Sequence, residues 1–121
     1  MLSDRELAKM YAYPDSGRAW VRTNFVSTID GAAQDGAGVS GSFGGEPDQR
    51  AFRMMRTLAD VILVGAGTAT AEGYEPVRRA EIDPGRRGHS GLSELPVIAV
   101  VSRSLDIPAA LIAPHQILIT T

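Results

Sequence analysis

The chain has 121 residues, 44% apolar and 21% charged, which is the composition of one ordinary globular domain with a modest core. A net charge of -2 gives no basic field for general nucleic-acid or membrane binding, and zero cysteines exclude disulfides, thiolate metal sites and a cysteine nucleophile. No apolar run approaches the roughly 18 residues of a membrane-spanning helix. The N-terminus is too charged for a signal peptide, so we expect a soluble, cytoplasmic protein.

The first third of the chain predicts one helix, one strand and one loop. Ser3 and Glu6 have the spacing of a capping box and predict a short helix over residues 3–11. Residues 19–28 are interpreted as a strand in which successive side chains face opposite sides, with Trp20 and Val26 on one side and Val21 and Phe25 on the other. Residues 29–45 are rich in glycine and predict a loop.

The clearest helix is predicted over residues 46–59, with Pro47 in its first turn and acidic residues at its N-terminal end. At about 100° per residue, Arg50 and Arg53 point away from the apolar stripe of this helix, while Arg56 lies at its edge. The predicted stripe consists of Ala51, Phe52, Met55, Leu58 and Ala59.

The rest of the chain predicts three apolar strands, at residues 60–65, 96–102 and 116–121. The first lacks alternation, which is typical of a strand covered on both faces. Residues 75–95 show no helical or strand period and predict a long loop, and residues 107–113 predict a short helix or turn. This order favours an α/β fold with a largely parallel, helix-covered sheet.

The turn from Gly65 to Thr68 follows a strand, as in dinucleotide-binding proteins, but Thr70 occupies the place of the third glycine of that fingerprint. Two interpretations remain open. The segment is a tight strand-to-helix turn, or its backbone N–H groups at Gly65 and Gly67 and the Thr68 hydroxyl hold a polar cofactor group.

Asparagine, arginine, aspartate and histidine side chains are further candidates for binding a ligand or a metal. Asn24 is a polar side chain on an otherwise apolar segment, and Arg56 needs an anionic partner if it is partly covered, which makes it the best candidate for binding a phosphate or carboxylate. Asp30 before glycine is ordinary turn chemistry. His89 and His115 are far apart in sequence and lack other metal-ligating residues, so no metal site is predicted.

Taken together, three stretches resemble the reductase domain of bifunctional riboflavin-biosynthesis proteins. They are "NFVSTIDGA" (24–32), "GVSGSFGGEPDQRAFRMMRTLADVILVGAGT" (38–68) and "AEGYEPVR" (71–78). The signature is a strand ending in Ser-hydrophobic-Asp-Gly, a glycine-rich loop, a helix with a late arginine and a GAGT segment followed by an acidic residue. The closest likeness is to free-standing pyrimidine reductase-like proteins of actinobacteria.

The resemblance implies a dihydrofolate reductase-like fold, with a central mixed, mostly parallel sheet flanked by helices. It implies NADPH-dependent reduction of a phosphorylated ribosylamino-pyrimidinedione, with hydride transfer to the ribose carbon. Two alternatives stay open. One is the same fold acting on another substrate, such as dihydrofolate. The other is a non-catalytic nucleotide-binding subunit or fragment.

The resemblance also assigns cofactor contacts by position. Val26 contacts NADPH through its backbone, and Thr68 and Glu72 match cofactor-binding positions. Ser42 lies near the cofactor, where family members often carry a large aromatic residue.

Substrate contacts carry over in the same way. Ser40, Arg56 and Pro76 match substrate-binding positions, and Arg79 matches a phosphate partner, with Arg78 as its substitute if the loop shifts by one residue.

Two positions are the catalytic candidates. Asn24 stands where many bacterial members carry a lysine close to the reacting sugar, so it implies a different proton source or a different substrate. Asp30 either caps its loop or helps to position substrate.

Length is the largest departure from the family, because its reductase domains run to roughly twice this chain. The missing half carries a glycine-rich segment that cradles the cofactor diphosphate, later strands and the dimer surface. We therefore expect residues 1–121 to be the N-terminal portion of one reductase domain, homodimeric at full length, with little or no activity alone. The apolar final strand fits this expectation; the alternative is a terminal strand that closes the fold.

Overall fold

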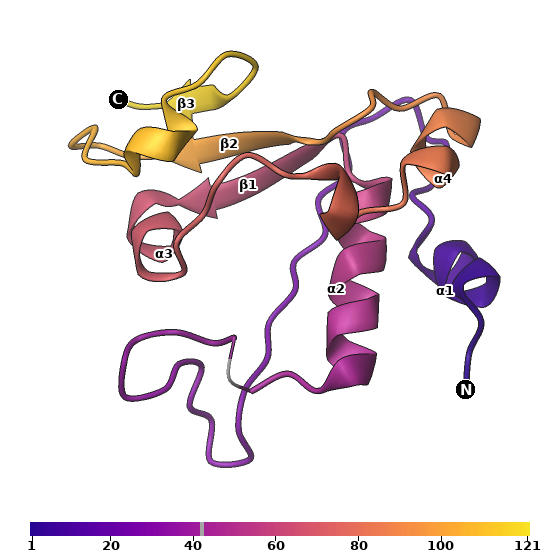
Figure 1. Cartoon of the computed structure of the whole chain (residues 1–121), viewed down its shortest axis with the longest axis horizontal. Helices are drawn as coiled ribbons and strands as arrows, with labels where there is room; N and C mark the ends of the chain where they lie inside the picture. Colours follow the sequence, from indigo (N-terminus) through magenta and orange to yellow (C-terminus); the bar gives the residue numbers. More distant parts are fainter. Residues whose placement is uncertain (42) are drawn as a thin grey trace.

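The computed structural model describes residues 1–41 and 43–121. All of the strands lie on one side of the molecule, and most of the helices lie on the other (Figure 1). None of the described helices is long and apolar enough to cross a membrane. The elements, in chain order, are helix α1 (Asp4–Tyr11), helix α2 (Glu46–Leu58), strand β1 (Val61–Gly65), helix α3 (Ala66–Ala71), the 3-10 turn η1 (Arg79–Glu81), helix α4 (Pro84–His89), strand β2 (Val97–Val101), the 3-10 turn η2 (Ala109–Leu111) and strand β3 (Ile117–Ile119).

The sheet has the order β1-β2-β3, and all three strands are parallel. Val61 pairs with Val97 and Gly65 with Val101, while Val101 also pairs with Ile119 on the other side. The three predicted strands and their parallel arrangement are confirmed. The mixed sheet implied by the resemblance is not seen in the described part of the chain, where no antiparallel pair is found.

The core lies on one face of this sheet. Val64, Ile98 and Val100 pack against Ala69 of α3 and against the segment containing Val77 and Ile82. The opposite face is open: Leu63 is 60% exposed, as are large parts of Val61, Val101, Ile117 and Ile119. The prediction that the first strand is covered on both faces was therefore wrong, because among the described residues helices cover only one face.

Helix α1 packs against α2 at the N-terminal side of the molecule. Its capping box forms as predicted: the Ser3 Oγ accepts a hydrogen bond from the Glu6 amide, and the Glu6 carboxylate accepts from the Ser3 amide at 2.8 Å. The Glu6 carboxylate also accepts from the Ser3 hydroxyl at 2.6 Å. The hydrogen bonds that the carboxylate accepts, first from the Ser3 hydroxyl and then from the Ser3 amide, hold the pKa of Glu6 below its ordinary value. Arg50 of α2 then pairs with Asp4 at 2.6 Å and joins the two helices.

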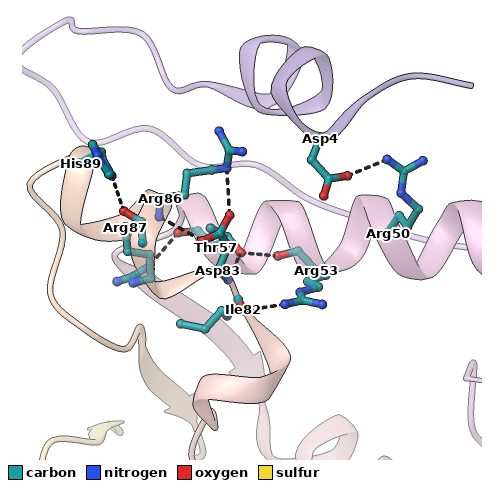
Figure 2. Close-up of polar contacts among 10 residues, drawn as sticks. Asp4, Arg50, Arg53, Thr57, Ile82, Asp83, Arg86, Arg87 and His89 are labelled. Carbon is teal, nitrogen blue, oxygen red and sulfur yellow. Dashed lines mark hydrogen bonds and ion pairs between the residues drawn. The ribbon is translucent and has the colours of Figure 1, made fainter.

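The buried side of α2 differs from the predicted stripe. Met54 and Thr57 are buried, whereas Phe52 is 40% exposed. Arg53, on the side away from the predicted apolar stripe, donates to the Ile82 carbonyl at 2.9 Å (Figure 2). Polar side chains of α2 form hydrogen bonds with α1 and with the segment after η1, so this side of the helix is in contact although it is not apolar. The spacing of apolar residues alone therefore predicted the wrong contact face.

Helix α4 corrects the prediction that residues 75–95 form a loop without helices. Asp83 is its N-cap and accepts a hydrogen bond from the Arg86 amide at 3.0 Å, and Pro84 occupies the first turn. An Asp-Pro pair is a common helix start, but a helix of six residues is too short to show a helical period in its apolar residues.

Arg87 of α4 joins three segments from a fully buried position (Figure 2). It donates to the Thr57 and Ala59 carbonyls at the end of α2, at 2.8 and 2.6 Å, and to the Ser93 carbonyl at 2.8 Å. Burial lowers the pKa of Arg87, with Asp60 opposing the shift, but a guanidinium remains charged at neutral pH. The arginine thus fixes the junction from α2 into β1.

Residues 19–28 do not form the predicted strand; they run as extended chain without a sheet partner among the described residues. Val21 and Phe25 are 79% and 85% exposed. Alternation gives a segment the side-chain pattern of a strand, but a ladder also needs a neighbouring strand to bond with.

Candidate functional site

One cavity of about 890 Å³ lies between α2, the start of α3, the turn after α3 and the glycine-rich loop. Its volume is within the usual range for small-molecule sites, roughly 300–1,000 Å³. Its wall combines segments that are far apart in the sequence, including Asn24, Ser40, Arg56, Thr68 and Arg78. The described chain therefore brings several predicted site residues into a single cavity.

Arg56 is the central cation of this cavity. Its side chain is 13% exposed, and its guanidinium carbon lies 4.6 Å from the centre of the Phe52 ring and 5.4 Å from that of Tyr74. Both distances are within the range of cation–π attraction. Phe52 is one helical turn before Arg56, so the two side chains share a face of α2. The rings hold the guanidinium in a fixed orientation at the cavity wall.

The hydrogen-bonding capacity of Arg56 is largely unused among the described residues. Its Nε is buried with no hydrogen-bond partner, and Nη1 lies 3.7 Å from Oε1 of Glu81. A guanidinium has five N–H donors, so this side chain can bind an oxyanion that enters the cavity. Arg56 is thus partly covered and lies near one carboxylate, which is the condition under which an anionic partner was expected. Its role in binding substrate stays a prediction.

Arg78, rather than Arg79, lies at the cavity. Arg79 is not among the described cavity residues and instead forms an ion pair with Glu94. Pro76 is half-buried and also outside the described lining. Arg78 is the N-cap of η1, which begins at Arg79. Which of the two arginines contacts a substrate phosphate stays a prediction.

The start of α3 forms another wall. Helix α3 follows β1 without an intervening loop, which confirms the strand-to-helix turn. Gly67 and Thr68 line the cavity, whereas Gly65, the N-cap, does not. A Cβ built on Gly67 would meet nothing within 4 Å, so there is open space above its backbone.

Glu72 and Ser40 both line the cavity, but they bind each other. The Glu72 carboxylate accepts from the Ser40 amide at 2.6 Å and from its hydroxyl at 2.9 Å. The predicted cofactor contact and the predicted substrate contact thus form a tether between the glycine-rich loop and the end of α3.

The remaining predicted residues divide into two groups. Asn24 and Val26 line the cavity. Asp30 does not: it accepts from the Thr28 hydroxyl within a tight turn, and that hydrogen bond, with backbone N–H groups, lowers the pKa of Asp30. The capping interpretation of Asp30 agrees with this geometry. Ser42 lies outside the described residues.

Several cavity residues were missed from the sequence. Phe52 and Tyr74 flank the key guanidinium, and Asp48, Glu75 and Glu81 add carboxylates. The spacing of four between Phe52 and Arg56 was a usable signal. Nothing in the sequence pattern brought Glu81 to Arg56, because that contact depends on the fold of residues 72–81.

Comparison with known proteins identifies the class. A pyrimidine reductase-like protein from Corynebacterium diphtheriae has a similar structure, with a TM-score of 0.61 and 32% sequence identity over 78% of this chain. The chain spans 41% of that protein. No curated protein sequence matches. The fold is α/β and of the dihydrofolate reductase-like class, as predicted.

Residues 19–121 match the model of the RibD C-terminal domain, and the chain belongs to this family. The predicted family is therefore confirmed.

Proposed function

We propose that the protein is an NADPH-dependent reductase of a phosphorylated ribosylamino-pyrimidinedione, 5-amino-6-(5-phosphoribosylamino)uracil, with hydride transfer to the ribose carbon. The observation that supports it most is the convergence of Asn24, Ser40, Arg56 and Thr68 on one cavity. In the family resemblance, these positions contact substrate or cofactor, and they come from four separate segments.

Arg56 and Arg78 are the proposed partners of the substrate phosphate. Both guanidinium groups reach the cavity, and Arg56 has N–H donors that no described residue uses. Charge-assisted hydrogen bonds from guanidinium to phosphate are short and strong, and a bidentate pair also fixes orientation. This anchor would hold the sugar in a defined position relative to Asn24.

The start of α3 fits a nicotinamide cofactor. Gly67 presents open backbone to the cavity, and the exposed Thr68 adds a hydroxyl beside it. The first N–H groups of a helix lack intrahelical partners, so they can bind polar or anionic cofactor groups. NADPH, when bound there, would supply the hydride.

Asn24 is the proposed positioning group near the reacting sugar. It lines the cavity, and its amide can donate and accept hydrogen bonds without carrying charge. An asparagine cannot act as the proton source that a lysine would be, so the proton added with the hydride comes from solvent or from substrate in this proposal.

Transfer of label tests the reaction directly. The protein, in excess over substrate, is incubated with NADPH carrying deuterium at both C4 positions of the nicotinamide, and product is analysed by mass spectrometry. We expect one deuterium in the ribitylamino product and none in a parallel incubation with dihydrofolate. Excess protein makes even slow transfer measurable.

Arg56→Gln is the matched variant, and Arg103→Gln, an exposed arginine outside the cavity lining, is the control. We expect label transfer to fall at least about tenfold in the first and to stay within about twofold in the second. Labelled tetrahydrofolate, or equal label transfer in the unmodified chain and Arg56→Gln, would contradict the proposed reaction.

A further inference from the structure

Glu81 lies between the two cavity arginines. Its Oε1 is 3.7 Å from Nη1 of Arg56, while its Oε2 is 3.5 Å from Nε of Arg78 and accepts from the Arg78 amide at 2.7 Å. One carboxylate therefore contacts both cations, in the position that a bound oxyanion would take.

The contact with Arg56 is loose. At 3.7 Å it is an ion pair without a close hydrogen bond, and Nε of the same guanidinium has no partner in the described chain. The Glu81 carboxylate is held at its other end, by the Arg78 amide. Glu81 therefore balances the charge of Arg56 but does not use all of its hydrogen-bond donors.

The excess of carboxylates around the cavity means that the contact between Glu81 and the arginines affects how an anion binds. Among the described lining residues, the cations are Arg56 and Arg78 and the carboxylates are Asp48, Glu72, Glu75 and Glu81. An anionic ligand thus enters a wall with more carboxylates than guanidinium groups. It gains strong binding only if the carboxylate nearest the arginines moves away from them.

We propose that Glu81 is an internal competitor for the anion site formed by Arg56 and Arg78, and that a ligand phosphate must displace it in order to bind. This inference rests on the proposed function, because it concerns how the same cavity takes up its substrate. A phosphate carries about -1.5 to -2 charges at neutral pH and three acceptor oxygens, so it can replace the single charge of Glu81 at both guanidinium groups. Displacing Glu81 costs free energy, so Glu81 lowers the affinity of the site for anions.

The movement required is small. The Glu81 side chain is 35% exposed and ends η1, so rotation about its side-chain bonds takes the carboxylate into solvent. Arg56 keeps its orientation meanwhile, since the Phe52 and Tyr74 rings flank it independently of Glu81.

Inorganic phosphate and acetate, without cofactor or pyrimidine, are the probes. Their dissociation constants are measured by NMR from the Nε–H signal of Arg56 in the 121-residue chain and in Glu81→Gln. Glutamine keeps an acceptor for the Arg78 amide but removes the charge. We expect phosphate to bind the variant about fivefold more tightly, and acetate to tighten by no more than phosphate does.

Glu75→Gln is the charge-matched control, because Glu75 lines the same cavity and forms no ion pair with another described residue. We expect it to change phosphate binding less than twofold. Glu81→Asp is the second variant: it keeps the charge but shortens the reach toward Arg56, and we expect it also to tighten phosphate binding.

Equal tightening in Glu81→Gln and Glu75→Gln would overturn the inference, as would unchanged phosphate binding in Glu81→Gln. The two proposals fail separately. Deuterium transfer to dihydrofolate instead of the ribosylamino-pyrimidine, with the phosphate results as expected, rejects the proposed reaction and keeps the role of Glu81. Deuterium transfer with unchanged phosphate binding in Glu81→Gln rejects only the competitor.

Discussion

At the scale of single residues, two arginines show what burial does to a guanidinium. Arg87 is fully buried and donates to three backbone carbonyls, so its guanidinium stabilises the fold and has no free side from which to bind a ligand. Arg56 is nearly as covered, but it has aromatic neighbours and unused donors, so its charge is available to a ligand. Burial alone does not distinguish a structural arginine from a binding one; the hydrogen-bond partners do.

Replacing Arg87 should destabilise the fold strongly. Arg87→Met leaves the Thr57, Ala59 and Ser93 carbonyls without their donor, and each buried unpaired acceptor costs about 1–3 kcal/mol. We expect the free energy of unfolding to fall by about 3 kcal/mol or more, measured by urea denaturation. The neighbouring Arg86→Met removes only a partly exposed pair with Asp83, and we expect a loss of about 1 kcal/mol or less. Equal losses would show that Arg87 has no special structural role.

The sequence predicted Arg56 because an arginine at the margin of an apolar stripe needs an anionic partner when it is covered. The same reasoning could not choose between Arg78 and Arg79. A one-residue shift in an irregular loop exchanges inward and outward side chains, and no periodicity marks the start of η1. Asp30 was likewise undecidable, since turn chemistry and a binding role use the same carboxylate.

At the scale of elements, local signals were the most reliable. The capping box of α1, the proline at the start of α2 and the apolar strands each predicted an element that the structure contains. The failures came where an element depends on partners. Residues 19–28 lack a neighbouring strand, and the buried side of α2 is decided by what α1 and α4 supply.

The capping box predicts a pH dependence for α1. Hydrogen bonds from Ser3 lower the pKa of Glu6 in the folded chain, so this contribution to stability is present above the ordinary pKa of 4.5 and is lost as pH falls through the lowered folded value. By NMR titration we expect the pKa of Glu6 to lie below 4.5 and to return toward it in Ser3→Ala. An unchanged pKa in that variant would show that Ser3 does not cause the shift.

The tether between Glu72 and Ser40 predicts order in the glycine-rich loop. Glu72→Ala removes the acceptor of both the amide and the hydroxyl of Ser40, so we expect the Ser40 amide to exchange with solvent about tenfold faster. Hydrogen exchange followed by NMR measures this, with Glu75→Gln as the control that leaves the tether intact. Equal exchange in all three proteins would mean that the loop is held by other contacts.

At the scale of the whole molecule, the sheet has one packed and one open face (Figure 1). On the open face, Leu63 of β1 and Ile119 of β3 are both exposed and lie on opposite sides of β2. The exposed apolar side chains of this face therefore form one surface rather than scattered positions. The chain also spans only 41% of its structural relative. The fold class was predictable because strands and helices alternate; how each face is covered was not, since no local pattern encodes it.

This surface should bind a hydrophobic dye. We expect the fluorescence of anilinonaphthalene sulfonate to rise in the presence of the folded chain and to fall in Leu63→Gln, because that change removes the most exposed apolar side chain of the face. Leu2→Gln, which alters an exposed leucine near the N-terminus, is the control and should leave the signal unchanged. Equal effects of the two variants would place the dye elsewhere.

The proposed function rests on Arg56 receiving a phosphate, and substrate affinity measures that contact most directly. By titration calorimetry of the 121-residue chain, 5-amino-6-(5-phosphoribosylamino)uracil should bind at least about tenfold more tightly than the same compound without its phosphate. Arg56→Gln should reduce that difference at least about fivefold, with Arg78 left as a phosphate partner, while leaving the weaker affinity of the unphosphorylated compound within about twofold. Equal affinities in the unmodified chain, or a phosphate preference of unchanged size in Arg56→Gln, would contradict the proposed function.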